Sequence, residues 1–199
     1  MNQVDNMVDR EADNMRSYLR GVVDSIEALP LEEIDRTIDA LFDAYKQKAQ
    51  IFIVGNGGSA ATAIHFAGDL NKTTITDLSA PRFRARALAE NISQVTAWAN
   101  DITYEEIFSQ QLMNFLEPND LVVAISGSGN SPNILRAVEY ANGRGALTIG
   151  LSGFAGGRLG ELADIAIICR NMEMLQVEDL HSVVCHYITW ELRERMRSC

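Results

Sequence analysis

The stretch IFIVGNGGSAATAIHFAGDL, residues 51–70, decides the fold class and raises the question of function. Its first four residues form an apolar, β-branched run that is typical of a strand buried on both faces. A glycine-rich turn follows, and then a run of small residues with helical character. A strand, a glycine turn and a helix in this order predict a βα unit of a parallel sheet, whose turn can hold an anion with backbone N–H groups.

Further strands and helices alternate along the rest of the chain. We expect a weaker strand at 85–89 and buried strands at 121–125, 147–151 and 165–169. We expect helices at about 58–70, 92–116 with a break near Asn100, 131–142 and 176–196. This alternation predicts an α/β fold, a three-layer sandwich with a central, mainly parallel sheet. Ligands of such sheets bind at the carboxyl ends of the strands.

Two amphipathic helices are expected before the sheet, over residues 5–28 and 31–48, with Pro30 between them. The apolar positions of the first are Val8 or Met7, Met15, Leu19, Val22, Val23 and Ile26. Together the two helices offer more apolar surface than one sheet edge covers, which indicates a subunit interface. We interpret residues 1–199 as one domain with residues 1–48 as its helical extension.

Composition excludes several classes of protein and favours a cytoplasmic one. The chain has 199 residues, 47% of them hydrophobic, and a net charge of −10, which argues against a nucleic-acid partner. A small phosphorylated ligand can still bind to backbone amides. No apolar run approaches the roughly 20 residues that span a bilayer, and the polar, acidic N-terminus is unlike a secretory signal. The three cysteines form no CxxC pair and leave an odd count, so we expect no disulfide framework and a reducing compartment. We expect no membrane partner, because no apolar run is long enough to span a bilayer.

A second glycine-rich loop follows the strand expected at 121–125. It is the segment SGSGNS, residues 126–131, and Pro132 after it makes Ser131 the expected N-cap of a helix. In the first loop Ser59 is the expected N-cap. Hydroxyls, an amide and free N–H groups can surround a phosphate here without Lys or Arg. Either loop alone could be an ordinary tight turn, and neither is a nucleotide-binding GxxxxGK[ST] or GxGxxG motif.

Several segments together resemble the sugar isomerase (SIS) domain family. The two loops, GNGGS and SGSGNS, indicate the SIS domain, while HFAGDL, AND at 99–101 and VEDLHSVVCH at 177–186 resemble its phosphoheptose isomerases. The resemblance covers essentially the whole chain. It implies an aldose–ketose isomerase that converts sedoheptulose 7-phosphate to D-glycero-D-manno-heptose 7-phosphate through an enediol. It also implies a bound divalent metal and a homotetramer.

All three histidines of the chain fall in two of the expected helices. His65 and Asp69 are four residues apart, so they share one helix face and can bind one metal ion together. The last helix carries His181 and His186. Taken alone, each histidine could also be an incidental, partly buried side chain.

The resemblance implies a zinc ion held by His65, Asp69, Glu178 and His186, with manganese or iron as alternatives. The family has Glu at the position of Asp69 and Gln at that of Glu178, so reach lost at one position can be regained at the other. Helix geometry leaves Asp179 open as an alternative to Glu178, because it lies seven residues before His186 and nearly in line with it.

Isomerisation of this kind needs a base, an acid and a polarised carbonyl. The resemblance implies Asp69 as the base, with Glu178 as the alternative, and His186 as the acid partner. The expected substrate-binding residues are Asn56, Gly57, Gly58, Ser59, Asp69, Asn100, Asp101, Ser126, Gly127, Ser128, Ser131 and Glu178.

Two other functions stay open. One is a non-catalytic SIS protein, similar to the replication-initiation regulators, which tend to lose the acidic residue after the first His and the final His; Asp69 and His186 favour the enzyme. The other is an isomerase of a different phosphosugar. It stays open because Ala60, Thr62 and Thr73 stand where the family has His, Asp and Arg.

Overall fold

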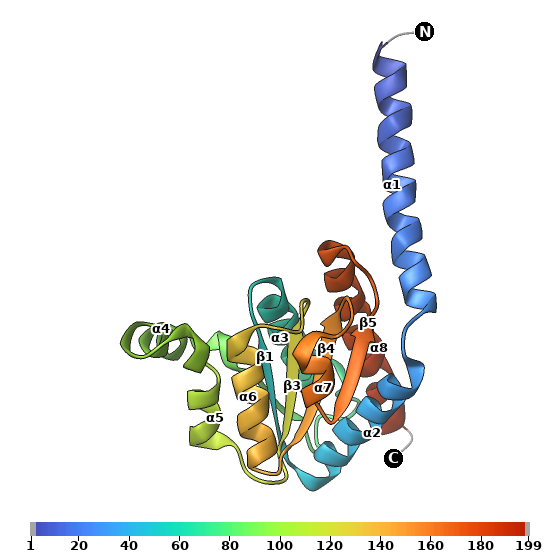
Figure 1. The fold of residues 1–199 in the computed structure, drawn as a ribbon. Coiled ribbons are helices and arrows are strands. Elements are labelled where there is room, and N and C mark those ends of the chain that lie inside the picture. Colours follow the sequence, from blue (N-terminus) through green and yellow to red (C-terminus); the bar gives the residue numbers. More distant parts are fainter. Residues whose placement is uncertain (1–2, 198–199) are drawn as a thin grey trace.

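The computed structural model describes the backbone of residues 3–197 and the side chains of residues 13–197. Its centre is one sheet in the order β2-β1-β3-β4-β5, and every neighbouring pair is parallel (Figure 1). The strands are β1 (Gln50–Gly55), β2 (Arg84–Ala87), β3 (Leu121–Ser126), β4 (Leu147–Gly153) and β5 (Ile165–Cys169). The predicted parallel sheet is confirmed.

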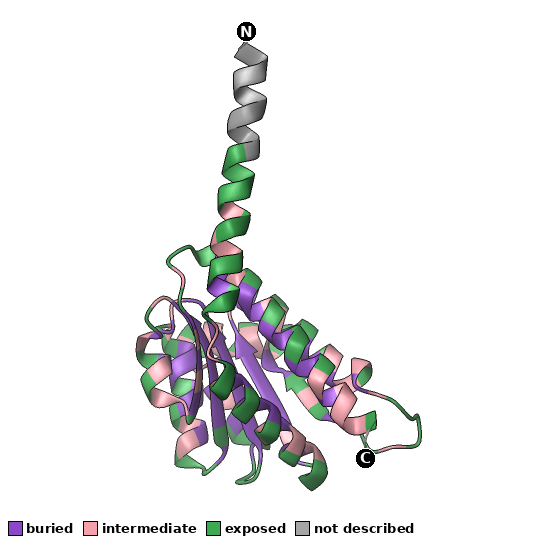
Figure 2. Cartoon of the chain, turned by 90° about the vertical axis from the view of Figure 1, so that its right-hand side faces the viewer, coloured by how far each residue is buried: buried purple, intermediate pink, exposed green. Residues whose placement is uncertain are grey.

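Helices cover both faces of the sheet, which confirms the three-layer sandwich. One face carries α2 (Leu31–Gln47), α3 (Gly58–Gly68) and α8 (Met174–Arg197). The other carries α5 (Ser109–Phe115), α6 (Pro132–Gly143) and α7 (Gly157–Leu162), of which the sequence analysis did not predict α7. Figure 2 shows the buried strands between these layers.

The side chains of β1 show how one strand serves both cores. Ile51 and Ile53 pack into the core under α2, α3 and α8, whereas Phe52 and Val54 pack into the core on the opposite face. The pleat of a strand directs successive side chains to opposite faces, so a continuous apolar run fills both layers.

The topology places both glycine loops at one crevice. β1 and β3 are neighbours and pair from Ile51↔Leu121 to Gly55↔Ile125, so their carboxyl ends meet at the same edge. The chain leaves β1 into α3 on one face and leaves β3 into α6 on the other. This divergence is the switch point at which ligands of open α/β sheets bind.

The segment between β2 and β3 is broken as expected near Asn100. It consists of a 3₁₀ turn η2 (Leu88–Glu90), α4 (Ile92–Asp101), a second 3₁₀ turn η3 (Tyr104–Glu106) and α5. α4 has no fully buried residue and lies at the edge of the molecule (Figure 1), where Val95, Trp98 and Ala99 pack against the core. The helix expected over 58–70 ends at Gly68 and continues as a π-helical turn η1 (Asp69–Thr73).

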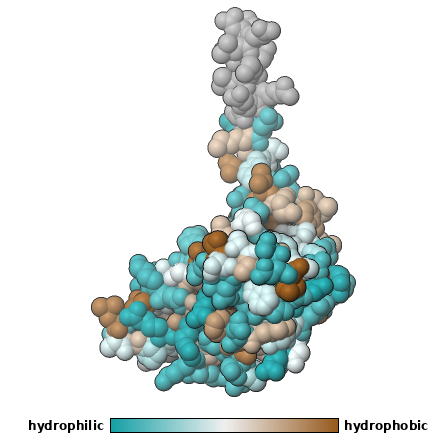
Figure 3. Space-filling model, turned by 90° about the vertical axis from the view of Figure 1, so that its left-hand side faces the viewer, coloured by the Kyte–Doolittle hydropathy of each residue, from teal (hydrophilic) through white to brown (hydrophobic). Residues whose placement is uncertain are grey.

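Helix α1 (Gln3–Glu27) extends away from the body (Figure 1). Its apolar side chains Met15, Leu19, Val23 and Ile26 are exposed, and Figure 3 shows apolar side chains on the described part of this helix. The positions expected at Val8 or Met7 lie outside the residues whose side chains are described. Within residues 3–197, no helix combines the length and the apolar character needed to cross a bilayer.

Candidate active site

The first loop bends into α3 at Gly57. Gly57 has a φ of +54° and is the residue that caps α3, so the prediction of Ser59 as the N-cap is wrong. Because Gly57 adopts a positive φ, α3 begins at Gly58, one residue before Ser59. Ser59 is buried in the first turn of the helix. The N–H groups of Gly58 and Ser59 have no acceptor within the helix at this end, which leaves them available to an anion.

The second loop leads into α6 as predicted, with Ser131 as the N-cap and Pro132 in the first turn. The Ser131 hydroxyl makes no capping hydrogen bond; instead its Oγ lies 3.4 Å from the Oγ of Ser126. Gly129 has a φ of +66°, and a Cβ there would lie 2.0 Å from the carbonyl oxygen of Gly156. Only glycine fits this approach between the loop after β3 and the loop after β4.

The two loops and the start of α8 enclose a cavity of about 280 Å³, which we call the serine pocket. It is lined by Asn56, Gly57, Gly58, Ser59, Ile125, Ser126, Gly127, Ser128, Ser131, Met174 and Glu178. Every loop residue expected to bind substrate is therefore in one place. The lining offers hydroxyls and backbone N–H groups without Lys or Arg, which is a neutral donor set for an anion.

Glu178 enters the serine pocket from α8. A Cβ on Gly58 would lie 2.8 Å from both carboxylate oxygens of Glu178, so this carboxylate lies directly against the first turn of α3. Gly58 leaves the room that Glu178 occupies. Asp179, the alternative ligand, lies elsewhere, because its Oδ2 accepts a 2.7 Å hydrogen bond from the Tyr18 hydroxyl on α1.

A second group of functional side chains, the histidine cluster, consists of His65, Asp69 and His186. Asp69 Oδ2 lies 3.6 Å from His65 Nε2 and 3.8 Å from His186 Nε2, and the two imidazole rings are 4.9 Å apart. The predicted shared face of His65 and Asp69 is confirmed. Asp69 begins the π-helical turn, and its Oδ1 accepts a 2.9 Å hydrogen bond from the Thr73 hydroxyl, which holds the carboxylate in place.

The donor set of the histidine cluster fits a divalent metal ion. One ligand atom from each of its three residues lies within 4.8 Å of the others. The cavity beside them has a volume of about 10 Å³, the room of roughly one water-sized atom. Two imidazoles and one carboxylate are typical of zinc and compatible with other first-row metals.

Two side chains near the cluster do not belong to its donor set. Glu178 is outside this group of ligand atoms. Cys185 lines the same small cavity but is also outside this group of ligand atoms, and burial raises the pKa of its thiol.

Asn100 and Asp101 lie outside both cavities. They end α4, and the Nδ2 of Asn100 donates a 2.8 Å hydrogen bond to Asp101 Oδ1. Neither residue lines the serine pocket or the cavity of the histidine cluster. Their role in substrate binding remains a prediction.

Helices α3 and α8 connect the two parts of the site. α3 starts at the serine pocket with Gly58 and reaches His65 after about two turns, roughly 10 Å along its axis. α8 likewise carries Glu178 to the serine pocket and His186 to the histidine cluster. The site can therefore hold a molecule with an anion at one end and a metal-binding group at the other.

Two residues of the site's framework were not predicted from sequence. Asn133, in the first turn of α6, and Tyr104, in η3, both hydrogen-bond the Asn56 side chain. Asn133 stands two residues after Ser131, which is a weak local signal. Tyr104 has no local signal, because only the packing of η3 brings it to the loop.

Comparisons with known proteins agree with this geometry. Residues 14–153 match the family model of the SIS domain. The phosphoheptose isomerase of Mycobacterium bovis (strain BCG / Pasteur 1173P2) is 39% identical over 151 residues, 76% of each chain. That of Helicobacter pylori is 33% identical over 185 residues, 93% of each chain.

The fold is also similar to that of solved phosphoheptose isomerases. GmhA from Neisseria gonorrhoeae superposes with a TM-score of 0.82 at 26% identity, covering 94% of this chain and 98% of that one. The phosphoheptose isomerase from Francisella tularensis gives a TM-score of 0.84 at 25% identity with the same coverage. The chain therefore belongs to the SIS-domain family and, within it, to the phosphoheptose isomerases.

Proposed function

We propose that the protein is an aldose–ketose isomerase that converts sedoheptulose 7-phosphate to D-glycero-D-manno-heptose 7-phosphate. The observation that carries this proposal is the separation of the serine pocket from the histidine cluster by about two turns of α3. An extended seven-carbon sugar phosphate can span this gap, whereas a triose phosphate cannot. The relatives named phosphoheptose isomerase support the same substrate.

The serine pocket is the proposed phosphate site. The hydroxyls of Ser59, Ser126, Ser128 and Ser131 and the N–H groups at the start of α3 provide donors, and the positive end of the α3 dipole favours an anion. All these donors are neutral. They can bind a phosphate without a Lys or Arg side chain in the pocket.

The histidine cluster is the proposed metal site, with His65, Asp69 and His186 as the residues that hold a divalent ion. A bound ion supplies Lewis-acid polarisation of the sugar carbonyl. We favour zinc because of the two imidazoles, and the carboxylate leaves manganese or iron compatible with the site. Three of the four residues expected from sequence form this cluster, and Glu178, which lines the serine pocket, stays a predicted fourth ligand.

Asp69 and His186 are the proposed proton-transfer groups. The hydrogen bond from Thr73 fixes Asp69 Oδ1, while Oδ2 lies between the two imidazoles. Asp69 takes the proton from the carbon beside the carbonyl and returns it to the neighbouring carbon. His186, which is more than half exposed, would hold the ion through one ring nitrogen and use the other to move the hydroxyl proton from one sugar oxygen to its neighbour.

A homotetramer in the cytoplasm is the proposed setting of this activity. The exposed apolar stripe on α1, formed by Met15, Leu19, Val23 and Ile26, needs a partner surface, and a second copy of the chain provides one. The buried free thiols of Cys169 and Cys185 fit a reducing compartment.

One experiment tests the activity. Purified protein is assayed for turnover of five- to seven-carbon ketose phosphates, and its metal content is measured on the same sample. We expect the highest kcat/KM for sedoheptulose 7-phosphate and about one divalent ion per chain. Turnover of a shorter ketose phosphate alone would assign another substrate. A metal-loaded protein that isomerises none of them would support the non-catalytic alternative.

A further inference from the structure

Tyr104 joins the turn η3 to the first glycine loop. Its hydroxyl donates a 2.9 Å hydrogen bond to the Oδ1 of Asn56, the residue that follows β1 and lines the serine pocket. Tyr104 itself is more than half exposed and lies outside that lining. This bond joins η3 directly to the loop after β1.

The side-chain oxygen of Asn56 accepts two hydrogen bonds from protein groups. Asn56 and Asn133 form a reciprocal amide pair, in which each Nδ2 donates 2.8 Å to the other's Oδ1. Asn133 is 1% exposed, and its Oδ1 also accepts a 3.0 Å hydrogen bond from the N–H of Ile134. That N–H fixes which atom of the Asn133 amide is oxygen, since a flipped amide would place two donors together.

Because the orientation of the Asn133 amide is fixed, it determines which atoms of Asn56 and Tyr104 donate and which accept hydrogen bonds. Asn56 must present its Nδ2 to Asn133 Oδ1 and its Oδ1 to Asn133 Nδ2. The second lone pair of Asn56 Oδ1 accepts the hydrogen bond from the Tyr104 hydroxyl. The Asn56 oxygen therefore has no capacity left for a ligand.

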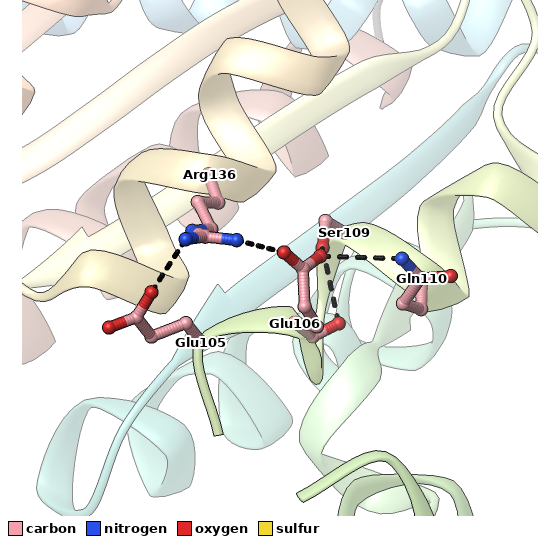
Figure 4. A network of polar contacts seen from close by, with 5 residues as sticks. All are labelled: Glu105, Glu106, Ser109, Gln110 and Arg136. Carbon is pink, nitrogen blue, oxygen red and sulfur yellow. Dashed lines mark hydrogen bonds and ion pairs between the residues drawn. The ribbon is translucent and has the colours of Figure 1, made fainter. Parts of the chain in front are cut away.

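The turn that carries Tyr104 is itself held against α6. Arg136 on α6 pairs with Glu105 at 2.7 Å and with Glu106 through its other terminal nitrogen (Figure 4). Glu106 also accepts hydrogen bonds from Ser109 and Gln110, and the Ser109 bond is the largest cause of its lowered pKa. With η3 held in this way, the Tyr104 hydroxyl approaches Asn56 from a fixed position.

We propose that Tyr104 is a positioning residue for the phosphate site, acting through Asn56 to hold the loop Gly57–Ser59 in its anion-binding shape. This inference rests on the proposed function of the serine pocket. It adds a loop-holding role for the Asn56 oxygen, while the second Nδ2–H of Asn56 stays available to donate to the phosphate. Tyr104 touches neither the phosphate nor the reacting carbons.

Tyr104→Phe tests this proposal, because it removes the hydroxyl and keeps the ring. We expect KM for the sugar phosphate and the inhibition constant of inorganic phosphate to rise by the same factor, about three- to tenfold, with kcat within about twofold of wild type. The matched control is Tyr140→Phe on α6, whose hydroxyl makes no hydrogen bond with the described residues. It should leave all three constants unchanged.

The outcomes separate the alternatives. An unchanged KM and phosphate inhibition constant in Tyr104→Phe would overturn the proposal, and so would a loss of kcat at constant KM, which would place Tyr104 at the reacting atoms. Equal thermal stability of the two variants excludes a general folding defect. If the wild type isomerises no phosphosugar, the proposed function fails; calorimetric titration of wild type and Tyr104→Phe with inorganic phosphate then still decides the role of Tyr104.

Discussion

The Nε2 atom of His186 lies 3.8 Å from the Oδ2 atom of Asp69, and the same oxygen lies 3.6 Å from His65 Nε2. α8, the last helix, thus brings its histidine to the end of α3, the first helix after β1. This arrangement, in which one carboxylate oxygen lies between two imidazoles, exists only in the folded chain. A metal ion bound there would also stabilise the fold, because it binds the native state alone.

His65→Ala and His186→Ala should each abolish metal binding and turnover together. Each removes one imidazole of a three-residue donor set, and kcat should fall by at least about a hundredfold. Elemental analysis and a turnover assay on the same samples measure both effects. Asp179→Asn is the control, since Asp179 faces Tyr18, and it should keep metal and activity. Loss of metal in that variant would instead make Asp179 a ligand.

Glu178→Gln should keep both metal and turnover, and should lower KM several-fold. The Glu178 carboxylate lies against Gly58 in the serine pocket, so it repels a bound phosphate by about 1 kcal/mol. Steady-state kinetics with metal analysis test this. Retained metal with lost turnover would identify Glu178 as the base in place of Asp69.

The double variant Ser126→Ala and Ser128→Ala should raise KM by about tenfold or more and leave kcat nearly unchanged. Both residues line the proposed phosphate site, and their proposed phosphate contacts are the same in the ground state and the transition state, so only uniform binding is lost. Ser79→Ala, at an exposed turn with Asp77, serves as the control. An unaltered KM in the double variant would remove the phosphate from this pocket.

Leu19→Asp with Val23→Asp should convert a tetramer to smaller species. Both side chains are exposed on the apolar stripe of α1, and a buried unpaired charge opposes association. Light scattering at micromolar concentration measures the mass. Ser17→Asp, on the opposite side of α1, should leave the mass unchanged. A monomeric wild type would contradict the proposed assembly.

Folding stability should decrease as pH falls from about 6.5 to about 4, because of His181. His181 is 1% exposed, and burial lowers its pKa from 6.5 to about 4. The Ser152 backbone slightly favours the protonated ring, but neither ring nitrogen has a hydrogen bond of good geometry with a described residue. The unfolded chain therefore binds a proton at a higher pH than the native chain does, and stability falls by up to about 3 kcal/mol across this range.

Urea unfolding at several pH values, with a chelator present to remove any metal contribution, measures this loss. His181→Gln lacks the titrating group, so its stability should change less between about pH 6.5 and about pH 4. The same pH dependence in both proteins would show that His181 is not its source.

The sequence by itself determined the order of the strands and of the helices other than α7, the two glycine loops, the Ser131 N-cap and the pairing of His65 with Asp69. Each of these depends on residues close together in the chain, through strand pleat, helix period or capping chemistry. The loops meet because parallel strands bring their carboxyl ends to one edge. Ser59 was misassigned as a cap because the φ of Gly57, +54°, is a property of the folded turn.

Only the tertiary structure decided which side chains of α8 reach the serine pocket and which reach the histidine cluster. Positions eight apart on a helix differ by about 80° around its axis, so the sequence left open whether Glu178 and His186 face the same part of the site. The packing of α8 against α3 directs Glu178 to Gly58 and His186 to Asp69. The bond from Tyr104 to Asn56 likewise depends on η3 packing against α6, which local sequence patterns do not encode.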